Sequence, residues 1–307
     1  MQRLDGGLAL PPALRGGWIA LGNFDGFHLG HQAVVGRAVA RARQAGVPAL
    51  VGTFDPHPVR FFRPDAPPFR LTTLSQRERL FAEAGADAVI VYRFDRQLAE
   101  TDAARFVADR LHALAGAVGV VTGEDFTFGA GRSGTADSLK RLGAAHGIAA
   151  EAVAPVALGD EPVSSSRIRR ALGNGEMATA TRLLTRPYTI AGTVQHGDKR
   201  GRELGYPTAN LSLGDYQRPR YGVYAVVGRL PGGKVRPGVA NLGVRPQFNA
   251  VELLEPFFFD WSGDLYGQCV EVELHAYLRP EGKFDGLEAM VAQMDRDCAA
   301  ARALLAR

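Results

Sequence analysis

The stretch GNFDGFHLGH, from Gly22 to His31, follows the apolar run Trp18–Leu21. The apolar run is typical of a buried strand, and the residues after His31 have the spacing of a helix. The stretch therefore lies where a strand passes into a helix, and the unpaired N–H groups and dipole of a helix start favour an anion. Its glycines let the backbone approach a phosphate closely, and His28 and His31 share one face of the first helical turn.

These histidines suggest a type of catalysis. Imidazoles directed at a triphosphate can donate hydrogen bonds to the charge that develops on the α-phosphate, so catalysis would be electrostatic and positional rather than covalent. Two other interpretations fit the same spacing. A His-x-x-His pair is common on surfaces and in cores, and it can also contribute to a zinc site, although no further ligand stands nearby in the sequence.

The composition is that of an ordinary globular protein. A chain of 307 residues favours two domains, and 46% hydrophobic with 22% charged residues excludes a disordered chain. We find no membrane-spanning segment and no signal-peptide pattern, and we expect a cytoplasmic protein. Cys269 and Cys298 stand far apart, which argues against a disulfide framework. The net charge of +4 comes from dispersed arginines, which indicates affinity for phosphates rather than nucleic acid.

The first half of the chain alternates strand and helix patterns. This alternation predicts a parallel sheet with right-handed crossovers, which binds ligands at the carboxyl ends of its strands. Ser75 and Glu78 have the spacing of a capping box. The expected strands are Trp18–Leu21, Ala49–Phe54, Ala88–Tyr92, Gly119–Thr122 and Ala149–Val156, and the expected helices are Gln32–Gln44, Ser75–Ala84, Ala103–Ala115 and Ala136–His146.

The pattern changes at Arg186-Pro187, so we expect one domain at residues 1–185 and another at 186–307. Short β-rich runs and turns follow, and a helical pattern from about Leu287 to Leu305 ends the chain. A small antiparallel β-barrel with one terminal helix is the simplest fold for this half. The expected strands are Tyr188–Val194, Gly222–Gly228, Lys234–Ala240, Phe257–Phe259 and Gln268–Leu278.

A family resemblance rests on four motifs of the first half. His28-Leu29-Gly30-His31 resembles the H-x-G-H signature that nucleotidylyl transferases share with class I tRNA synthetases. The series GNFDGFHLGH, TFDPHP (Thr53–Pro58), GEDFTFG (Gly123–Gly129) and SSSRIR (Ser164–Arg169) resembles the adenylyltransferase half of bacterial bifunctional riboflavin kinase/FAD synthetases. The resemblance implies a Rossmann-like nucleotidylyl transferase domain that binds ATP and FMN.

The resemblance also implies site residues, with His28 and His31 as the catalytic pair. The hydroxyls and guanidiniums of SSSRIR would donate to the β- and γ-phosphates, with Ser166 in place of the family's threonine. Read alone, SSSRIR is an N-cap with a basic helix end, and Asp125 is a turn residue. The implied ATP- and FMN-binding residues are Gly22, Asn23, Phe24, Asp25, Gly26, Asp55, His57, Asp125, Ser164, Ser165, Ser166, Arg167 and Arg169.

The second half carries a riboflavin kinase signature. HGDKRGRELGYPTANL (His196–Leu211) resembles the family's G-x-x-R-G-x-x-L-G-x-P-T-A-N. Its glycines and basic residues would form a loop over the phosphates, and the neutral oxygens of Thr208 and Asn210 suit Mg²⁺. Read alone, PTAN is a turn that enters a strand. The implied ATP- and flavin-binding residues are Gly197, Lys199, Arg200, Gly201, Pro207, Thr208 and Asn210.

Counting back from Asp264-Leu265-Tyr266-Gly267, a string typical of these kinases, places Glu255 at the family's catalytic glutamate. A carboxylate there can accept the proton of the riboflavin 5′-OH as that oxygen attacks the γ-phosphate. Glu252 and Asp260 are competing candidates. Gln247 and Phe257 depart from the family's threonine and histidine, which leaves flavin affinity and kinase rate open.

We therefore expect a bifunctional enzyme whose substrates are riboflavin, FMN and ATP. The barrel would phosphorylate riboflavin, and the α/β domain would transfer AMP from ATP to FMN. One rival is a nucleotidylyl transferase with another acceptor and a passive barrel. The other is a tRNA-handling protein, although SSSRIR lacks the lysine of a K-M-S-K-S motif. The sequence leaves the oligomeric state open.

Overall fold

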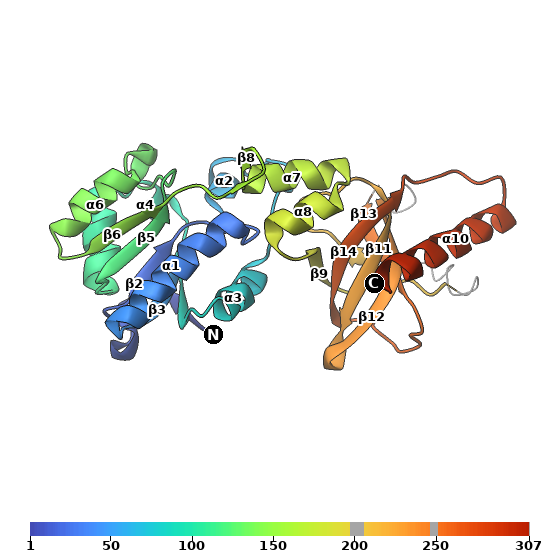
Figure 1. The fold of residues 1–307 in the computed structure, drawn as a ribbon, viewed down its shortest axis with the longest axis horizontal. Helices are drawn as coiled ribbons and strands as arrows, with labels where there is room; N and C mark the ends of the chain where they lie inside the picture. Colours follow the sequence, from blue (N-terminus) through green and yellow to red (C-terminus); the bar gives the residue numbers. More distant parts are fainter. Residues whose placement is uncertain (197–205, 246–250, 307) are drawn as a thin grey trace. The chain divides into compact units, whose positions relative to one another are not determined.

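The computed structural model describes residues 1–196, 206–245 and 251–306 (Figure 1). The chain divides into two compact units. The first comprises Met1–Pro67 with Thr72–Ser164, and the second comprises Pro68–Leu71 with Ser165–Arg307. The second unit thus begins earlier than the expected functional boundary at residue 186, which stays a prediction. None of the helices in the described ranges is long and apolar enough to cross a membrane.

The first unit contains the expected parallel sheet, with six strands in the order β1-β4-β3-β2-β5-β6. The order runs outward from β2 in both directions, through β3 on one side and through β5 on the other. The carboxyl ends of β2 and β5 therefore flank the position where ligands bind in sheets of this kind. The strands are β1 (Gln2–Asp5), β2 (Trp18–Leu21), β3 (Ala49–Asp55), β4 (Ala88–Arg93), β5 (Gly119–Gly123) and β6 (Ala149–Val153).

Helices cover both faces of this sheet. On one face, α1 and α3 pack on side chains that include Ala20, Val51 and Val121, and on the other face, η2 and α6 pack on Ile19 and Leu50. The alternation of neighbouring strand residues between the two faces explains why these strands are apolar throughout. The helical segments are α1 (Leu29–Ala45), α2 (Pro58–Phe62), α3 (Leu74–Glu83), α4 (Arg96–Ala99), α5 (Ala103–Arg105), η2 (Phe106–Leu114) and α6 (Ala136–Ala144).

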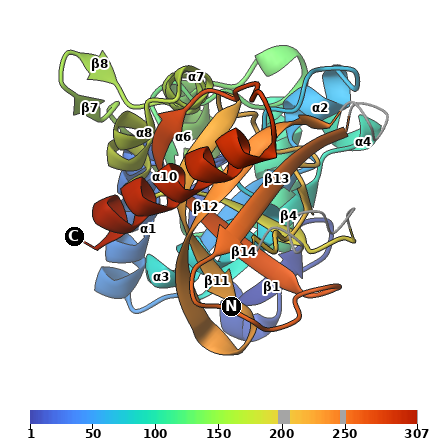
Figure 2. The ribbon, with the colours of Figure 1, turned by 90° about the vertical axis from the view of Figure 1, so that its right-hand side faces the viewer.

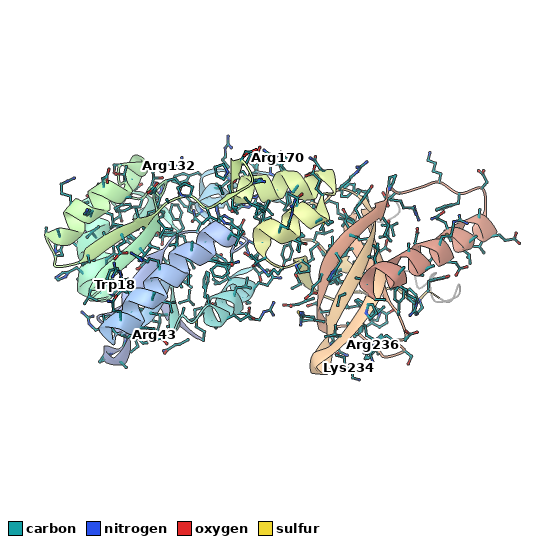
Figure 3. The ribbon with its side chains drawn as sticks, in the orientation of Figure 1. Trp18, Arg43, Arg132, Arg170, Lys234 and Arg236 are labelled. Carbon is teal, nitrogen blue, oxygen red and sulfur yellow. The ribbon has the colours of Figure 1, made fainter. Side chains whose placement is uncertain are left out.

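Trp18, labelled in Figure 3, is a large side chain that the sheet accommodates beside a glycine. It pairs with Gly119 across the β2–β5 ladder. A Cβ at Gly119 would lie 2.4 Å from the indole ring, so a glycine is required beside this tryptophan. The indole can therefore pack flat against the neighbouring strand, and Trp18 is buried although it is the first residue of a short strand.

Three local expectations were wrong in detail. The capping box of α3 is formed by Thr73 and Gln76, not by Ser75 and Glu78, because the helix begins at Leu74 and Ser75 is already inside it. Glu78 instead accepts two hydrogen bonds from Arg3. The expected strand at Ala149–Val156 ends at Val153, and the edge strand β1 was not expected.

The second unit begins with two helices and continues with an antiparallel sheet of six strands in the order β10-β13-β12-β11-β14-β9. The backbone N–H of Gln195, just after β9, donates to the carbonyl of Asn210, just before β10, at 2.9 Å. This bridge links the two edges of the sheet, so the strands form a nearly closed barrel. The elements are α7 (Ser165–Asn174), α8 (Met177–Leu184), β9 (Tyr188–Thr193), β10 (Leu211–Ser212), β11 (Gly222–Leu230), β12 (Lys234–Arg245), β13 (Val251–Phe258) and β14 (Cys269–Arg279).

The terminal helix α10 (Leu287–Leu305) has the expected bounds and crosses the outer face of the barrel (Figure 2). Ala301 packs there against Ala225 and Phe259. Asp297 of α10 is 6% exposed and accepts hydrogen bonds from Arg279 of β14 at 2.7 to 3.0 Å. The predicted architecture, a Rossmann-like parallel sheet and an antiparallel barrel with a terminal helix, is confirmed.

Candidate active sites

The loop between β2 and α1 has an unusual backbone. Phe24, Gly26 and Phe27 have φ angles of 52°, 86° and 44°, and the two phenylalanines adopt this left-handed conformation despite their side chains. Both rings are buried and contact Phe81 edge-on, with ring centroids 5.6 and 5.2 Å away. Burial of two aromatic rings thus holds a backbone conformation that costs energy, which is a common property of functional loops.

His28 and His31 lie at the N-terminus of α1. His28 is the N-cap residue, and its Nδ1 accepts a hydrogen bond from the backbone N–H of His31 at 3.4 Å. The two imidazole rings stack with centroids 3.6 Å apart and planes inclined by 19°. A Cβ at Gly30 would lie 3.2 Å from His28 Cε1, so the glycine keeps space beside the ring. The structure therefore brings together the two histidines that the sequence singled out.

Asp25 faces inward and ties the loop to the start of α3. It is 4% exposed, and its Oδ1 accepts a hydrogen bond from the backbone N–H of Thr72 at 3.0 Å. The Thr72 hydroxyl also accepts from the N–H of Gly26 at 2.9 Å. Asp25 thus has a clear structural function, and its contact with a substrate stays a prediction.

Arg77 of α3 is a residue that the sequence interpretation missed. It is 3% exposed, and its Nη1 donates to the Asn23 carbonyl at 2.7 Å and to the Thr53 hydroxyl at 2.8 Å. Its Nη2 donates to Asp55 Oδ1 at 3.3 Å. Two of the predicted site residues, Asn23 and Asp55, are therefore held by one guanidinium at the carboxyl ends of β2 and β3.

His57 and a group of aromatic residues lie just beyond the carboxyl end of β3. His57 caps α2, because its Nδ1 accepts from the N–H of Val59 at 3.2 Å. Phe61, Phe62 and Phe94 form a cluster with ring centroids 5.2 to 5.7 Å apart, and Phe62 is 65% exposed. A partly exposed aromatic cluster offers a surface for a planar ring system. The sequence signal for it was the pair of phenylalanines three residues after TFDPHP.

The remaining motifs of the first half lie on loops or at a helix start. Asp125 is exposed, two residues after the end of β5. Ser164 ends the first unit and Ser165 begins α7 in the second. Arg169 of α7 donates through Nε to the Phe69 carbonyl at 2.7 Å, and its guanidinium lies 5.4 Å from the Phe69 ring centroid.

The structure describes His196 and residues 206–211 of the kinase motif. Gly197, Lys199, Arg200 and Gly201 lie outside the described residues. The backbone N–H of Ala209 donates to the Pro256 carbonyl at 2.9 Å, and Leu211 pairs with Leu254. Continued by one residue, this register places Asn210 opposite Glu255.

Glu255 lies in a polar cross-strand row. It pairs with Asn241 of β12 in the register of the sheet, and Asn210 lies on its other side. Residues opposite each other in antiparallel strands have side chains on the same face. Asn241 Nδ2 donates to Glu281 Oε1 at 3.2 Å, and a Cβ at Gly243 would lie 2.1 Å from that oxygen. The row thus joins two residues from separate sequence motifs, one proposed for metal binding and one for catalysis.

The two competing carboxylates, Glu252 and Asp260, each bind an arginine. Glu252 accepts hydrogen bonds from Arg218, at 2.7 Å from Nε, and from the Tyr221 hydroxyl. The guanidinium of Arg218 is the main cause that holds the pKa of Glu252 below its ordinary value. Asp260 is paired with Arg302 at 3.1 Å, which likewise lowers its pKa. A carboxylate held ionised by an arginine is a weak proton acceptor, which argues against Glu252 and Asp260 as the general base.

The oxygen donors in this region are of the kind that Mg²⁺ prefers. Thr208 offers a hydroxyl and Asn210 an amide oxygen, and the two residues are separated only by Ala209, whose N–H donates to the Pro256 carbonyl of β13. Across the described ranges, no three His, Cys, Asp or Glu side chains are grouped as ligands for a metal ion.

Comparisons with known proteins agree with both halves. Residues 10–167 match the FAD synthetase family, and residues 184–305 match the riboflavin kinase family. The chain is 41% identical to the bifunctional riboflavin kinase/FMN adenylyltransferase of Pseudomonas fluorescens, over all of this chain and 98% of that protein. It is 38% identical to the protein of the same name from Escherichia coli K12, over 92% of this chain and 91% of the other.

A solved structure has the same fold over nearly the whole chain. It is the crystal structure of a protein described as a macrolide-efflux protein from Streptococcus pneumoniae, with a TM-score of 0.87 and 31% sequence identity. The match covers 98% of this chain and 99% of the other. This likeness concerns the fold, and the activity in that description stays with that protein.

The fold and the two matched family models define a transferase with two modules, a nucleotidylyl transferase sheet and a kinase barrel. The matched families and the relatives that span both modules also identify the reactions, FAD synthesis and riboflavin phosphorylation. The chain belongs to the family of bifunctional riboflavin kinase/FMN adenylyltransferases.

Proposed function

We infer that the chain makes flavin cofactors in two steps, each of which consumes ATP. It phosphorylates riboflavin to FMN and then adenylylates FMN to FAD with release of pyrophosphate. The presence of both families' motifs in one chain, in the order of the relatives, supports this activity most directly. We place the protein in the cytoplasm, where riboflavin and ATP are available to it.

For adenylyl transfer, we propose that His28 and His31 bind the reacting phosphates of ATP. An FMN phosphate oxygen attacks the α-phosphorus, and the bond to the bridging oxygen breaks so that pyrophosphate leaves. The stacked imidazoles at the α1 N-terminus can donate hydrogen bonds to the charge that builds on the α-phosphate. Their fixed position, set by the N-cap bond, means that little reorganisation is needed during the reaction.

The other motifs of this half have supporting functions in the proposal. Asn23, Asp55 and His57 border the substrates at the ends of β2 and β3. The partly exposed aromatic cluster of Phe61, Phe62 and Phe94 suits the isoalloxazine ring of FMN. The hydroxyls and arginines of SSSRIR bind the departing pyrophosphate.

For the kinase step, we propose Glu255 as the general base. It accepts the proton of the riboflavin 5′-OH while that oxygen attacks the γ-phosphorus, and ADP leaves. Thr208 and Asn210 would hold Mg²⁺, which neutralises charge on the ATP phosphates when it is bound. The cross-strand position of Asn210 beside Glu255 supports this assignment, because it brings the proposed base next to a proposed metal ligand.

A time course of the purified chain tests the function. Riboflavin and MgATP are supplied, the flavins are separated by chromatography, and ADP and pyrophosphate are measured. We expect FMN to form first and FAD to follow, with one ADP per FMN formed and one pyrophosphate per FAD. Absence of FMN from riboflavin, with adenylyl transfer intact, would favour a transferase with a passive barrel.

A further inference from the structure

Arg77 is a buried cation in an uncommon position. Its side chain is 4% exposed, although it belongs to the charged run Arg77-Glu78-Arg79, which is typical of a solvated helix face. Burying a guanidinium is costly unless its N–H groups are satisfied and its charge is balanced. Arg77 must therefore make contacts that offset this cost.

The contacts of Arg77 converge on the catalytic edge of the sheet. Nη1 donates to the Asn23 carbonyl, which also accepts from the Thr53 hydroxyl at 3.1 Å. Nη2 donates to the Asp55 carboxylate, whose side chain is 30% exposed. One planar fork thus fixes both the loop that leads to His28 and the carboxylate at the end of β3.

The start of α3 holds the same loop at a second point. Thr72, just before the helix, bonds both Asp25 and Gly26. The loop of residues 23–26 is therefore attached to the α3 region at two places, through Thr72 and through Arg77, and Arg77 extends the attachment to Asp55. Because His28 follows this loop directly, a shift in residues 23–26 would move the imidazole pair.

We propose that Arg77 is a positioning residue for adenylyl transfer, which sets the geometry of Asn23 and Asp55 and, through the loop, that of His28. Its side chain is only 4% exposed, so we assign it no contact with ATP or FMN. This inference rests on the FMN adenylyltransferase activity proposed above. A displacement of about 1 Å at a reacting group can lower the rate by roughly 100-fold, so the effect of losing Arg77 should fall on kcat.

The test uses the full-length chain with the substitutions Arg77→Gln and Arg77→Lys. Arg79→Gln is the matched control, because Arg79 lies two residues further along the same helix and is half exposed. Each variant is assayed for FAD formation from FMN and MgATP, and for FMN formation from riboflavin. Near-UV circular dichroism and thermal melting report the folded fraction of each sample.

We expect Arg77→Gln to lower kcat for FAD formation about 10- to 100-fold per folded molecule, with the KM values for FMN and ATP changed less than about threefold. Arg77→Lys keeps the charge but not the fork, so it should lose about 3- to 10-fold. Arg79→Gln should be within about twofold of the wild type, and FMN formation should be unchanged in all three.

A double-mutant cycle tests whether Arg77 acts through Asp55. If it does, the variant with both Arg77→Gln and Asp55→Asn should be no slower than the slower single variant, because coupled residues are not additive. Independent losses that multiply would overturn that coupling. If Arg77→Gln does not fold, Arg77→Lys carries the test.

Two results would overturn the proposal. One is FAD formation by Arg77→Gln or Arg77→Lys within about twofold of the control. The other is a loss that only follows the folded fraction, which would make Arg77 a structural residue alone. Failure of the wild-type chain to form FAD in the same assay would instead contradict the activity on which the proposal rests.

Discussion

Replacing Glu255 with glutamine removes a proton acceptor and keeps the size of the side chain. Glu255 is half-buried between Asn210 and Asn241, and an amide of the same size can occupy its position in the cross-strand row. A general base contributes about 10² to 10⁴ in rate, which corresponds to roughly 3 to 5 kcal/mol of activation free energy. We therefore expect Glu255→Gln to slow FMN formation by about 10²- to 10⁴-fold.

The assay compares two reactions on the same protein. FMN formation from riboflavin and FAD formation from supplied FMN are each followed by chromatography of the flavins. Since the base acts on the riboflavin hydroxyl and not on the FMN phosphate, FAD formation from FMN should stay at the wild-type rate. This second reaction also shows that the first unit of the variant is folded.

Glu252→Gln is the matched control, because it makes the same chemical change three residues earlier on β13. Its carboxylate is bound by Arg218 and Tyr221, so its loss should change FMN formation only a few-fold. Wild-type FMN formation by Glu255→Gln would refute the assignment. The candidacy would then pass to Glu252 or Asp260, according to which variant loses the activity.

Three further predictions concern the histidines, the domain boundary and acid stability. His28→Ala and His31→Ala should each lower FAD formation by roughly 100-fold or more and leave FMN formation unchanged, whereas equal loss of both activities would indicate misfolding. A fragment that starts at Arg186 should make FMN but no FAD. A fragment that starts at Ser165 should melt at a higher temperature than the one that starts at Arg186, because it also contains α8, which buries Leu183 and Leu184 within the second unit. Equal melting temperatures of the two fragments would show that α7 and α8 add no stability. Arg218 lowers the pKa of Glu252 in the folded chain below its ordinary value of 4.5. The ionised carboxylate therefore stabilises the folded chain above pH 4.5, and this contribution is lost as the pH falls through the pKa of Glu252 in the folded state. Melting of Glu252→Gln should therefore depend less on pH below about 4.5 than melting of the wild type, and an identical pH dependence would contradict this linkage.

Much of the fold follows from local sequence signals. The β2–α1 junction was predictable because an apolar strand, a glycine-rich turn and a helix start follow one another within fourteen residues of chain, Trp18 to His31. Gly46, directly after α1, has a φ of 67° and ends the helix, as glycines at this position often do. The edge strand β1 was missed because it contains one buried apolar residue, Leu4, and so lacks the pattern of a strand.

The contacts within the sites were less predictable, since they join distant parts of the chain. Arg77 lies in a run of charged residues, and its partners Asn23 and Thr53 are 54 and 24 residues away. No local pattern distinguishes it from Arg79, which is half exposed. Similarly, the capping box of α3 could be read at Thr73 or at Ser75, because both have a Gln or Glu three residues later. The helix starts at Leu74, and not two residues later, in the position that buries Gln76, Arg77 and Phe81.

The central claim is that two separate sites carry out successive reactions in one chain. Mixing His28→Ala with Glu255→Gln tests it most directly, with riboflavin and MgATP as the supplied substrates. Alone, the first variant should accumulate FMN, and the second should form almost no flavin nucleotide. Together they should make FAD, because FMN released by one variant is adenylylated by the other. A mixture that makes no more FAD than the separate variants, although the first still accumulates free FMN, would contradict the claim.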